Sequence, residues 1–308
     1  MLKKIFSLLL SAMMLFTMSA TGLAAAPDTL HGKIAAIETD VYGSEQIGAI
    51  GERLNKLESD ITGKHLTESM MARVNTLYEV LYINESHPSM LAELNAIEWT
   101  INHEVNMTPV QPRLANLEMT LEGKTSAGDF DSRIDALGKV AFGSIDIPME
   151  LTDVPADTLI KVALVTPVNA KNLKQGDAIE FKVAEDVLVN DCLIFAKGEP
   201  GRGKVAKVVQ ARNFGRDAEV VIDFDETKSI DGTYVDTFIG EESKKQMEHM
   251  AMAAGASIAG MVILGPVGII AGAFVKGKNI DLPAGTEVYI QTKGDSRVYG
   301  VRTVSDNL

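Results

Sequence analysis

The chain has 308 residues, of which 42 are acidic and 29 are basic, so its formal net charge is -13. This balance leaves no basic face for a phosphate backbone, and we exclude nucleic acid as a partner. The single cysteine, Cys192, excludes an internal disulfide, and we predict that it is a small buried residue in a strand. The length is sufficient for two domains with hydrophobic cores.

The amino-terminal residues have the layout of a cleaved secretory signal. Lys3 and Lys4 precede an apolar stretch, residues 5–18, that contains no acidic residue, and three alanines follow at 24–26. We therefore predict a signal peptide over residues 1–26. The protein is expected to be exported to the periplasm or the outer membrane.

Residues 27–145 contain a sequence repeat with a period of 20 residues. Six units share one register, so that the pattern beginning at Arg53 and Glu58 recurs at Arg113 and Glu118. The apolar residues of a unit lie on one stripe of a helix, and the glycine after them suits a left-handed helix end. A helix this short cannot bury its stripe alone, so we predict an array of six short helices that stack on their neighbours. The recurring basic residue and glutamate are interpreted as solvated rims of the stripe.

Two interpretations of this array remain open from the sequence. It is either a surface that binds or tethers a partner, or a spacer or stalk without a specific ligand. Trp99, Tyr78 and Tyr82 are candidate recognition residues, although aromatic residues at helical spacing more often belong to a core.

From residue 150 to residue 308 the hydrophobic pattern changes from helical to alternating. The alternation predicts short strands, which are separated by turns rich in glycine, proline and aspartate. Many short strands at this spacing favour an antiparallel β sandwich or barrel. The predicted fold class is therefore α+β with two domains.

The sequence offers no convincing catalytic or metal site. Residues 198–204 have the spacing of a phosphate-binding loop, but Val205 stands where a serine or threonine should hold magnesium. The five histidines are scattered without ligand spacing, and no nucleophile has an evident base. We expect a protein that is not an enzyme, with no catalytic residue, no cofactor and no metal.

An uncharged apolar run, residues 250–275, interrupts the β domain. About 20 apolar residues suffice to cross a bilayer core, and Gly265-Pro266 divides this run near its middle. Small residues at four-residue spacing let helices pack closely in lipid. We predict a glycine-rich helical hairpin, inserted at residues 247–277, that enters a membrane; a single bent helix and burial in the β domain's own core are the alternatives. The residues predicted to insert are Gly255, Gly260, Ile263, Leu264, Gly265, Pro266, Gly268, Ile270, Gly272 and Phe274.

Four short stretches of the β domain, at residues 155–160, 183–187, 193–198 and 283–286, carry a resemblance to a known family. They resemble the outer-membrane β domain of the core-complex subunit of type IV secretion and conjugation machinery. The resemblance implies a β domain with a helical hairpin before the last strands that reaches the outer membrane, and the apolar run lies at the corresponding place. The chain departs from that family in its predicted cleaved signal and its helical repeats, which stand where the family has an uncleaved helix and a proline-rich linker.

Together these observations predict a non-enzymatic structural, tethering or assembly protein of the envelope of a bacterium with two membranes. Its expected partners are membrane lipid, another envelope protein or a cell-wall polymer, and a further copy of the chain. The alternative is a soluble exported binding module whose apolar hairpin is buried in its own core.

Overall fold

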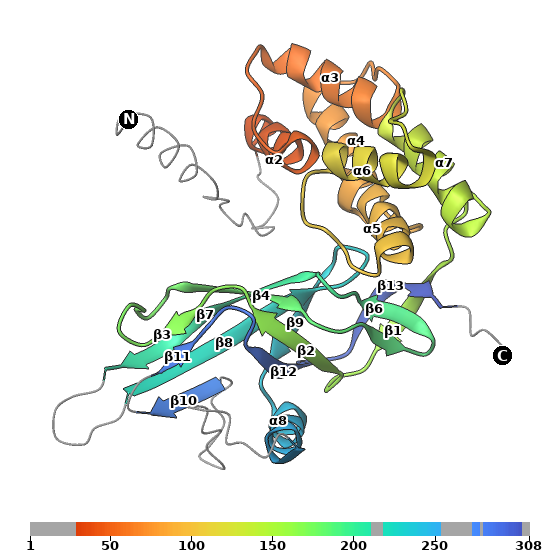
Figure 1. The fold of residues 1–308 in the computed structure, drawn as a ribbon. Coiled ribbons are helices and arrows are strands. Elements are labelled where there is room, and N and C mark those ends of the chain that lie inside the picture. Colours follow the sequence, from red (N-terminus) through yellow and green to blue (C-terminus); the bar gives the residue numbers. More distant parts are fainter. Residues whose placement is uncertain (1–28, 211–217, 254–272, 278–279, 304–308) are drawn as a thin grey trace, which may run out of the picture.

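A computed structural model of the chain describes residues 29–210, 218–253, 273–277 and 280–303. Within these residues a helical domain is followed by an antiparallel β domain, which confirms the α+β class (Figure 1). The predicted signal peptide, residues 1–26, lies outside the described part of the chain.

The helical domain consists of six helices of 13 residues each. They begin at residues 30, 50, 70, 90, 110 and 130, in step with the sequence repeat. Their bounds are α2 (Leu30–Tyr42), α3 (Ile50–Thr62), α4 (Met70–Tyr82), α5 (Met90–Asn102), α6 (Val110–Glu122) and α7 (Phe130–Phe142). The sequence sets both helix ends locally: Ser69, for example, accepts a hydrogen bond from the Ala72 N–H at a start, and Gly63 adopts φ +66° at an end.

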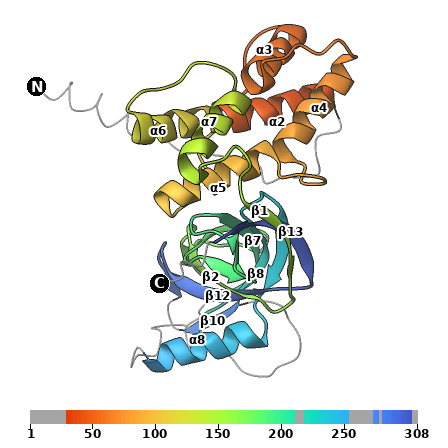
Figure 2. The same cartoon turned by 90° about the vertical axis from the view of Figure 1, so that its right-hand side faces the viewer.

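The helical array closes on itself. α2 contacts α6 and α3 contacts α7, in addition to contacts between neighbours, and the apolar stripes of all six helices form one core. Each helix does stack on its neighbours in sequence, and the additional contacts make the repeats one bundle around a shared core (Figure 2).

Six strands of the β domain close into a barrel. Their order is β8-β7-β4-β2-β12-β9, and β9 pairs back to β8; β10 is added beside β8. These strands are β2 (Leu159–Leu164), β4 (Ala178–Val183), β7 (Pro200–Val209), β8 (Ala218–Lys228), β9 (Tyr234–Phe238), β10 (Ala273–Gly277) and β12 (Glu287–Thr292). A second sheet has the order β1-β13-β6-β5, and β3 pairs with β11. Their bounds are β1 (Met149–Val154), β3 (Val168–Asn169), β5 (Val187–Val189), β6 (Cys192–Phe195), β11 (Asp281–Leu282) and β13 (Ser296–Arg302).

Glycines of the apparent phosphate-binding loop, residues 198–204, serve the packing of the barrel. Gly201 and Gly203 lie in β7, so no helix follows the loop. A Cβ atom on Gly201 would lie 1.9 Å from Cε2 of Phe181, and one on Gly203 would lie 2.0 Å from the Asp223 carbonyl oxygen. These glycines are required because a ring and a neighbouring strand approach the backbone of β7 closely.

Both flanks of the apolar run are attached to the barrel. α8 (Glu241–Ala253) packs against β12, where the Ser243 N–H donates to Oε1 of Gln291 at 2.9 Å, and Met247 is buried in the barrel core. β10 pairs with β8, with Phe274 opposite Val221.

The prediction of a helical insertion over residues 247–277 is therefore wrong at its carboxyl end, since residues 273–277 form a strand. The other nine predicted insertion residues lie in 254–272, outside the described residues. Within the described part of the chain, no helix has the length and hydrophobicity needed to span a membrane.

The helical domain docks on the barrel through α5 and the loop that follows it. Ala96 and Val105 join Leu193, Ala196 and Ile230 in a small apolar cluster between the two domains. The Val105 N–H also donates to the Lys197 carbonyl at 2.9 Å. In both views the helical domain lies on one side of the barrel, and α8 and β10 lie on the opposite side (Figures 1 and 2).

Candidate binding surface

Four ion pairs with buried glutamates join consecutive repeats of the helical domain, and we call them the inter-repeat pairs. In each, an arginine reaches the glutamate that lies 15 residues earlier, one repeat back. The pairs are Arg53–Glu38, Arg73–Glu58, Arg113–Glu98 and Arg133–Glu118, with closest N···O distances of 2.6, 2.6, 2.7 and 2.6 Å. The interpretation of these residues as solvated rims is wrong, because the glutamates are at most 3 % exposed.

The same glutamates also fix the loops between the helices. Glu38, Glu98 and Glu118 each accept the backbone N–H of the residue eight positions later, at 2.9 Å. A buried carboxylate is stable only when it is paired and hydrogen-bonded, and these contacts satisfy both needs. Burial acts to raise the pKa of Glu118, but the hydrogen bonds from Arg133 and the Ser126 N–H hold that pKa below its usual value.

The repeat is interrupted between the third and fourth units. Tyr78 and Glu93 occupy the positions that hold glutamate and arginine in the four inter-repeat pairs, so no such pair can form between them. The helix α4 also ends differently, because Ile83 is extended where the other five helices end in a left-handed residue, which is glycine in four of them and His103 in α5. The next residue, Asn84, donates to the Asp231 carbonyl of the barrel at 2.8 Å. The interruption therefore lies where the helical domain meets the barrel.

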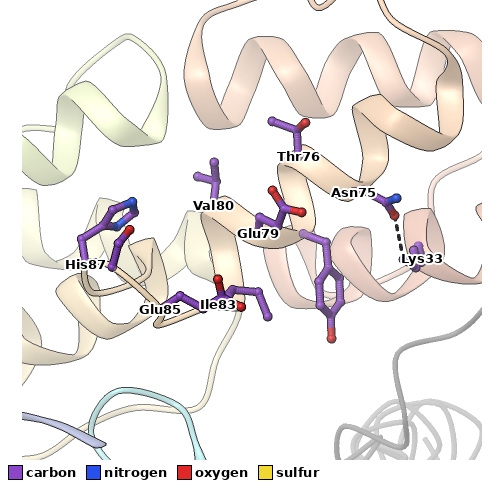
Figure 3. Close-up of a pocket in the computed structure, with 10 residues that line it drawn as sticks. Lys33, Asn75, Thr76, Glu79, Val80, Ile83, Glu85 and His87 are labelled. Atoms are coloured by element: carbon purple, nitrogen blue, oxygen red, sulfur yellow. Dashed lines mark hydrogen bonds between the residues drawn. The ribbon is translucent and has the colours of Figure 1, made fainter. Parts of the chain in front are cut away.

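A groove with a volume of about 540 Å³ lies beside this interruption (Figure 3). Residues of α2, α4 and the loop after α4 line it: Lys33, Asn75, Thr76, Tyr78, Glu79, Val80, Ile83, Glu85, Ser86 and His87. Lys33 occupies the position of the arginines in the other units. Its Nζ donates to Oδ1 of Asn75 at 2.7 Å and lies 5.5 Å from the centroid of the Tyr78 ring. The groove thus brings together Lys33 of α2 and Tyr78 of α4, which belong to none of the four inter-repeat pairs.

The groove is acidic with an amine at one end. Glu79 and Glu85 are exposed along it, while Lys33 is held against Asn75. Glu93 is not among the lining residues, and burial, followed by the negative charges of Asp131 and Asp135, raises its pKa to about 7. The acidic side chains of the groove are Glu79 and Glu85. Such a surface suits a partner that presents a cationic group.

The three aromatic candidates from the sequence have different surroundings. Tyr78 lines the groove, and its ring centroid lies 4.6 Å from that of Tyr82. The Tyr82 hydroxyl donates to Oδ2 of Asp40 at 2.7 Å. Trp99 belongs to the contact with the barrel, where its Nε1–H donates to Oδ2 of Asp186 at 2.9 Å. Of the three, Tyr78 is the residue that the structure places at the groove.

Among the described residues, no group of three or more histidine, cysteine, aspartate or glutamate side chains is arranged to hold a metal ion. Cys192 is a free, buried residue of β6. That the protein needs no cofactor and has no catalytic site remains a prediction from the sequence.

The comparisons with known proteins return little. No protein-family model matches the chain, and no curated protein matches it. Among solved structures, the chain is similar to ComB10 of the Com type IV secretion system of Helicobacter pylori, with 16% sequence identity and a TM-score of 0.25. The match covers 46% of this chain and 88% of that chain. At this TM-score the likeness carries no conclusion about the fold or the role of the chain.

Proposed function

We propose that the protein is a non-enzymatic structural protein of the bacterial cell envelope that tethers a partner to a membrane. The observation that carries this proposal is the placement of its two candidate contact regions. The helical domain with its groove lies on one side of the barrel, and the flanks of the apolar run lie on the opposite side (Figures 1 and 2).

The membrane contact is assigned to residues 254–272, which contain no charged side chain. The segment starts at α8 and ends at β10, and both elements are attached to the barrel. Inserting an uncharged segment of this composition into lipid is favourable, whereas exposing it to water is not. The barrel would thus hold the apolar segment at a fixed place relative to the helical domain.

The partner contact is assigned to the groove of the helical domain. The docking bonds made by Asn84, Trp99 and Val105 fix the orientation of this domain on the barrel. A partner bound at the groove would therefore be held at a set distance from the membrane, which is the function of a tether. An envelope protein or a cell-wall polymer with a cationic group fits the acidic lining.

Cell fractionation tests the proposal. The wild-type protein is compared with a variant in which residues 254–272 are replaced by a glycine–serine linker of equal length, and with a control in which the β7–β8 loop, residues 211–217, is replaced in the same way. The wild type and the control should pellet with membranes and be released by detergent, whereas the first variant should be recovered in the soluble periplasmic extract.

Recovery of the wild type in the soluble extract would contradict the proposal, as would pelleting of the 254–272 variant to the same extent as the wild type. Loss of folding in that variant, seen by circular dichroism, would instead support the soluble module with a buried hairpin.

A further inference from the structure

Glu199 is a buried acid in the turn between β6 and β7, at the contact between the two domains. Its side chain is 0 % exposed. Oε1 is 3.4 Å from the donor Nδ2 of Asn95, and Oε2 has no hydrogen-bond partner among the described residues. The turn itself is held against the helical domain: Gly198 has φ +96°, and a Cβ atom there would lie 2.4 Å from the Val105 carbonyl oxygen. A carboxyl group in this position receives little of the hydrogen bonding that an ionised form requires.

The helical domain presents Asn95 to Glu199 in a defined orientation. Arg113 can only donate hydrogen bonds, and its Nη2 donates to Oδ1 of Asn95 at 2.6 Å. The amide nitrogen of Asn95 must therefore face the barrel, where it also donates to the Ile230 carbonyl at 2.9 Å. The inter-repeat pair Arg113–Glu98 is thus connected to the barrel through one asparagine.

Besides Tyr234 of β9, which is a titratable neighbour, charged groups of four elements surround Glu199. Lys228 of β8 and Arg113 of α6 favour its ionised form, while Asp231 of the turn after β8 and Glu98 of α5 oppose it. None of these groups donates a hydrogen bond to Oε2. Burial is the largest influence, and it raises the pKa of Glu199 to about 7.

We propose that Glu199 is a proton-operated lock between the helical domain and the barrel: the neutral acid keeps the domains docked, and ionisation releases them. The inference is independent of the proposed function, because it requires neither a membrane nor a partner. It assigns a regulatory role to Glu199, whose burial at the domain contact the tethering function does not explain.

The direction of the pH effect follows from linkage. When the domains separate, Glu199 meets water and its pKa returns toward the ordinary value of 4.5, whereas in the docked state it is about 7. The open form therefore binds fewer protons, and opening becomes more favourable as the pH rises from 4.5 to 7. With these two values, the ratio of open to docked molecules rises roughly 40-fold between about pH 5 and pH 7 and less than about twofold above that.

Amide hydrogen exchange of the mature protein tests the lock. The Val105 N–H is bonded across the contact, so its protection factor, corrected for the intrinsic exchange rate, reports opening. In the wild type, this protection should fall by roughly 40-fold between about pH 5 and pH 7. In E199Q, which keeps the shape but cannot ionise, and in E199L, which has no polar atom, the protection should change less than about threefold. The control is E104Q. Glu104 is an exposed carboxylate at the same contact and pairs with Lys182 and Lys197, so this variant should keep the wild-type pH dependence.

The proposal is overturned if the wild-type protection of Val105 is independent of pH, or if E199Q and E199L retain the wild-type dependence. It is also overturned if E104Q abolishes the dependence, because the titrating group would then lie in the exposed pair. Protection of barrel amides such as that of Ile160, which is bonded within the closed sheet, serves as the reference for global unfolding.

Discussion

The inter-repeat pairs predict a large loss of stability when one partner is removed. Arg133 donates from Nε and Nη2 to the two carboxylate oxygens of Glu118, at 2.6 and 2.9 Å. In Arg133→Met the stem of the side chain still packs, but Glu118, which is 1 % exposed, keeps only the hydrogen bond from the Ser126 N–H. Removing one partner of a buried pair costs about 3–5 kcal/mol, and the partial access of water to Arg133 argues for about 3 kcal/mol.

The assay is urea denaturation followed by far-ultraviolet circular dichroism. Lys56→Met is the matched control, since Lys56 pairs with Asp60 on the surface of α3, where the two side chains are 54% and 30% exposed. That change should cost less than about 1 kcal/mol. Adding Glu118→Gln to Arg133→Met removes the stranded charge and should restore at least about 1 kcal/mol. If Arg133→Met is no more destabilising than Lys56→Met, the pairs do not hold the repeats together and the reasoning fails.

Because folding raises the pKa of Glu93 from 4.5 to about 7, the ionised carboxylate destabilises the folded state at higher pH. Below pH 4.5 this cost is absent, because Glu93 is then neutral in both the folded and the unfolded state. Glu93→Gln should therefore stabilise the protein by about 1–2 kcal/mol near pH 8, after a discount for solvent screening, and by almost nothing near pH 4; an equal shift of the thermal midpoint at both pH values would contradict this. Gly201→Ala should cost about 2–3 kcal/mol in chemical denaturation because its Cβ atom would meet the Phe181 ring, whereas Gly294→Ala, where an added Cβ atom meets nothing within 4 Å, should be neutral.

Features determined by neighbouring residues were predictable from the sequence. The helix bounds follow the 20-residue repeat, because the apolar stripe and the glycine after it act within one unit. The strands of the barrel follow the alternation of buried residues, as in β2, where Ile160, Val162 and Leu164 are buried.

The inter-repeat pairs were missed because they join different helices. Within one repeat, Arg53 and Glu58 are five positions apart and do not face each other. The pairing partner of Arg53 is Glu38, 15 residues earlier, and this contact depends on how α2 and α3 pack. One signal was available: where Tyr78 replaces the glutamate, Glu93, 15 residues later, replaces the arginine.

The apolar run was misread at its carboxyl end for a related reason. A segment as short as Ala273–Gly277, which is apolar up to Val275, has no period that separates a helix from a strand. The segment forms a strand because it pairs with the edge of β8, and the residues of β8 lie far away in the sequence. The groove likewise depends on the closure of the bundle, which brings Lys33 of α2 to Asn75 of α4.

Flotation with liposomes tests the central claim most directly. The purified mature protein is mixed with vesicles that contain anionic lipid and is centrifuged in a density gradient, alone and with Ile263 and Ile270 both replaced by lysine. The account predicts that the wild type floats with the vesicles, and that the double variant stays at the bottom of the gradient with an unchanged circular dichroism spectrum. A wild type that remains at the bottom, or a double variant that unfolds because the lysines are forced into a protein core, would contradict it.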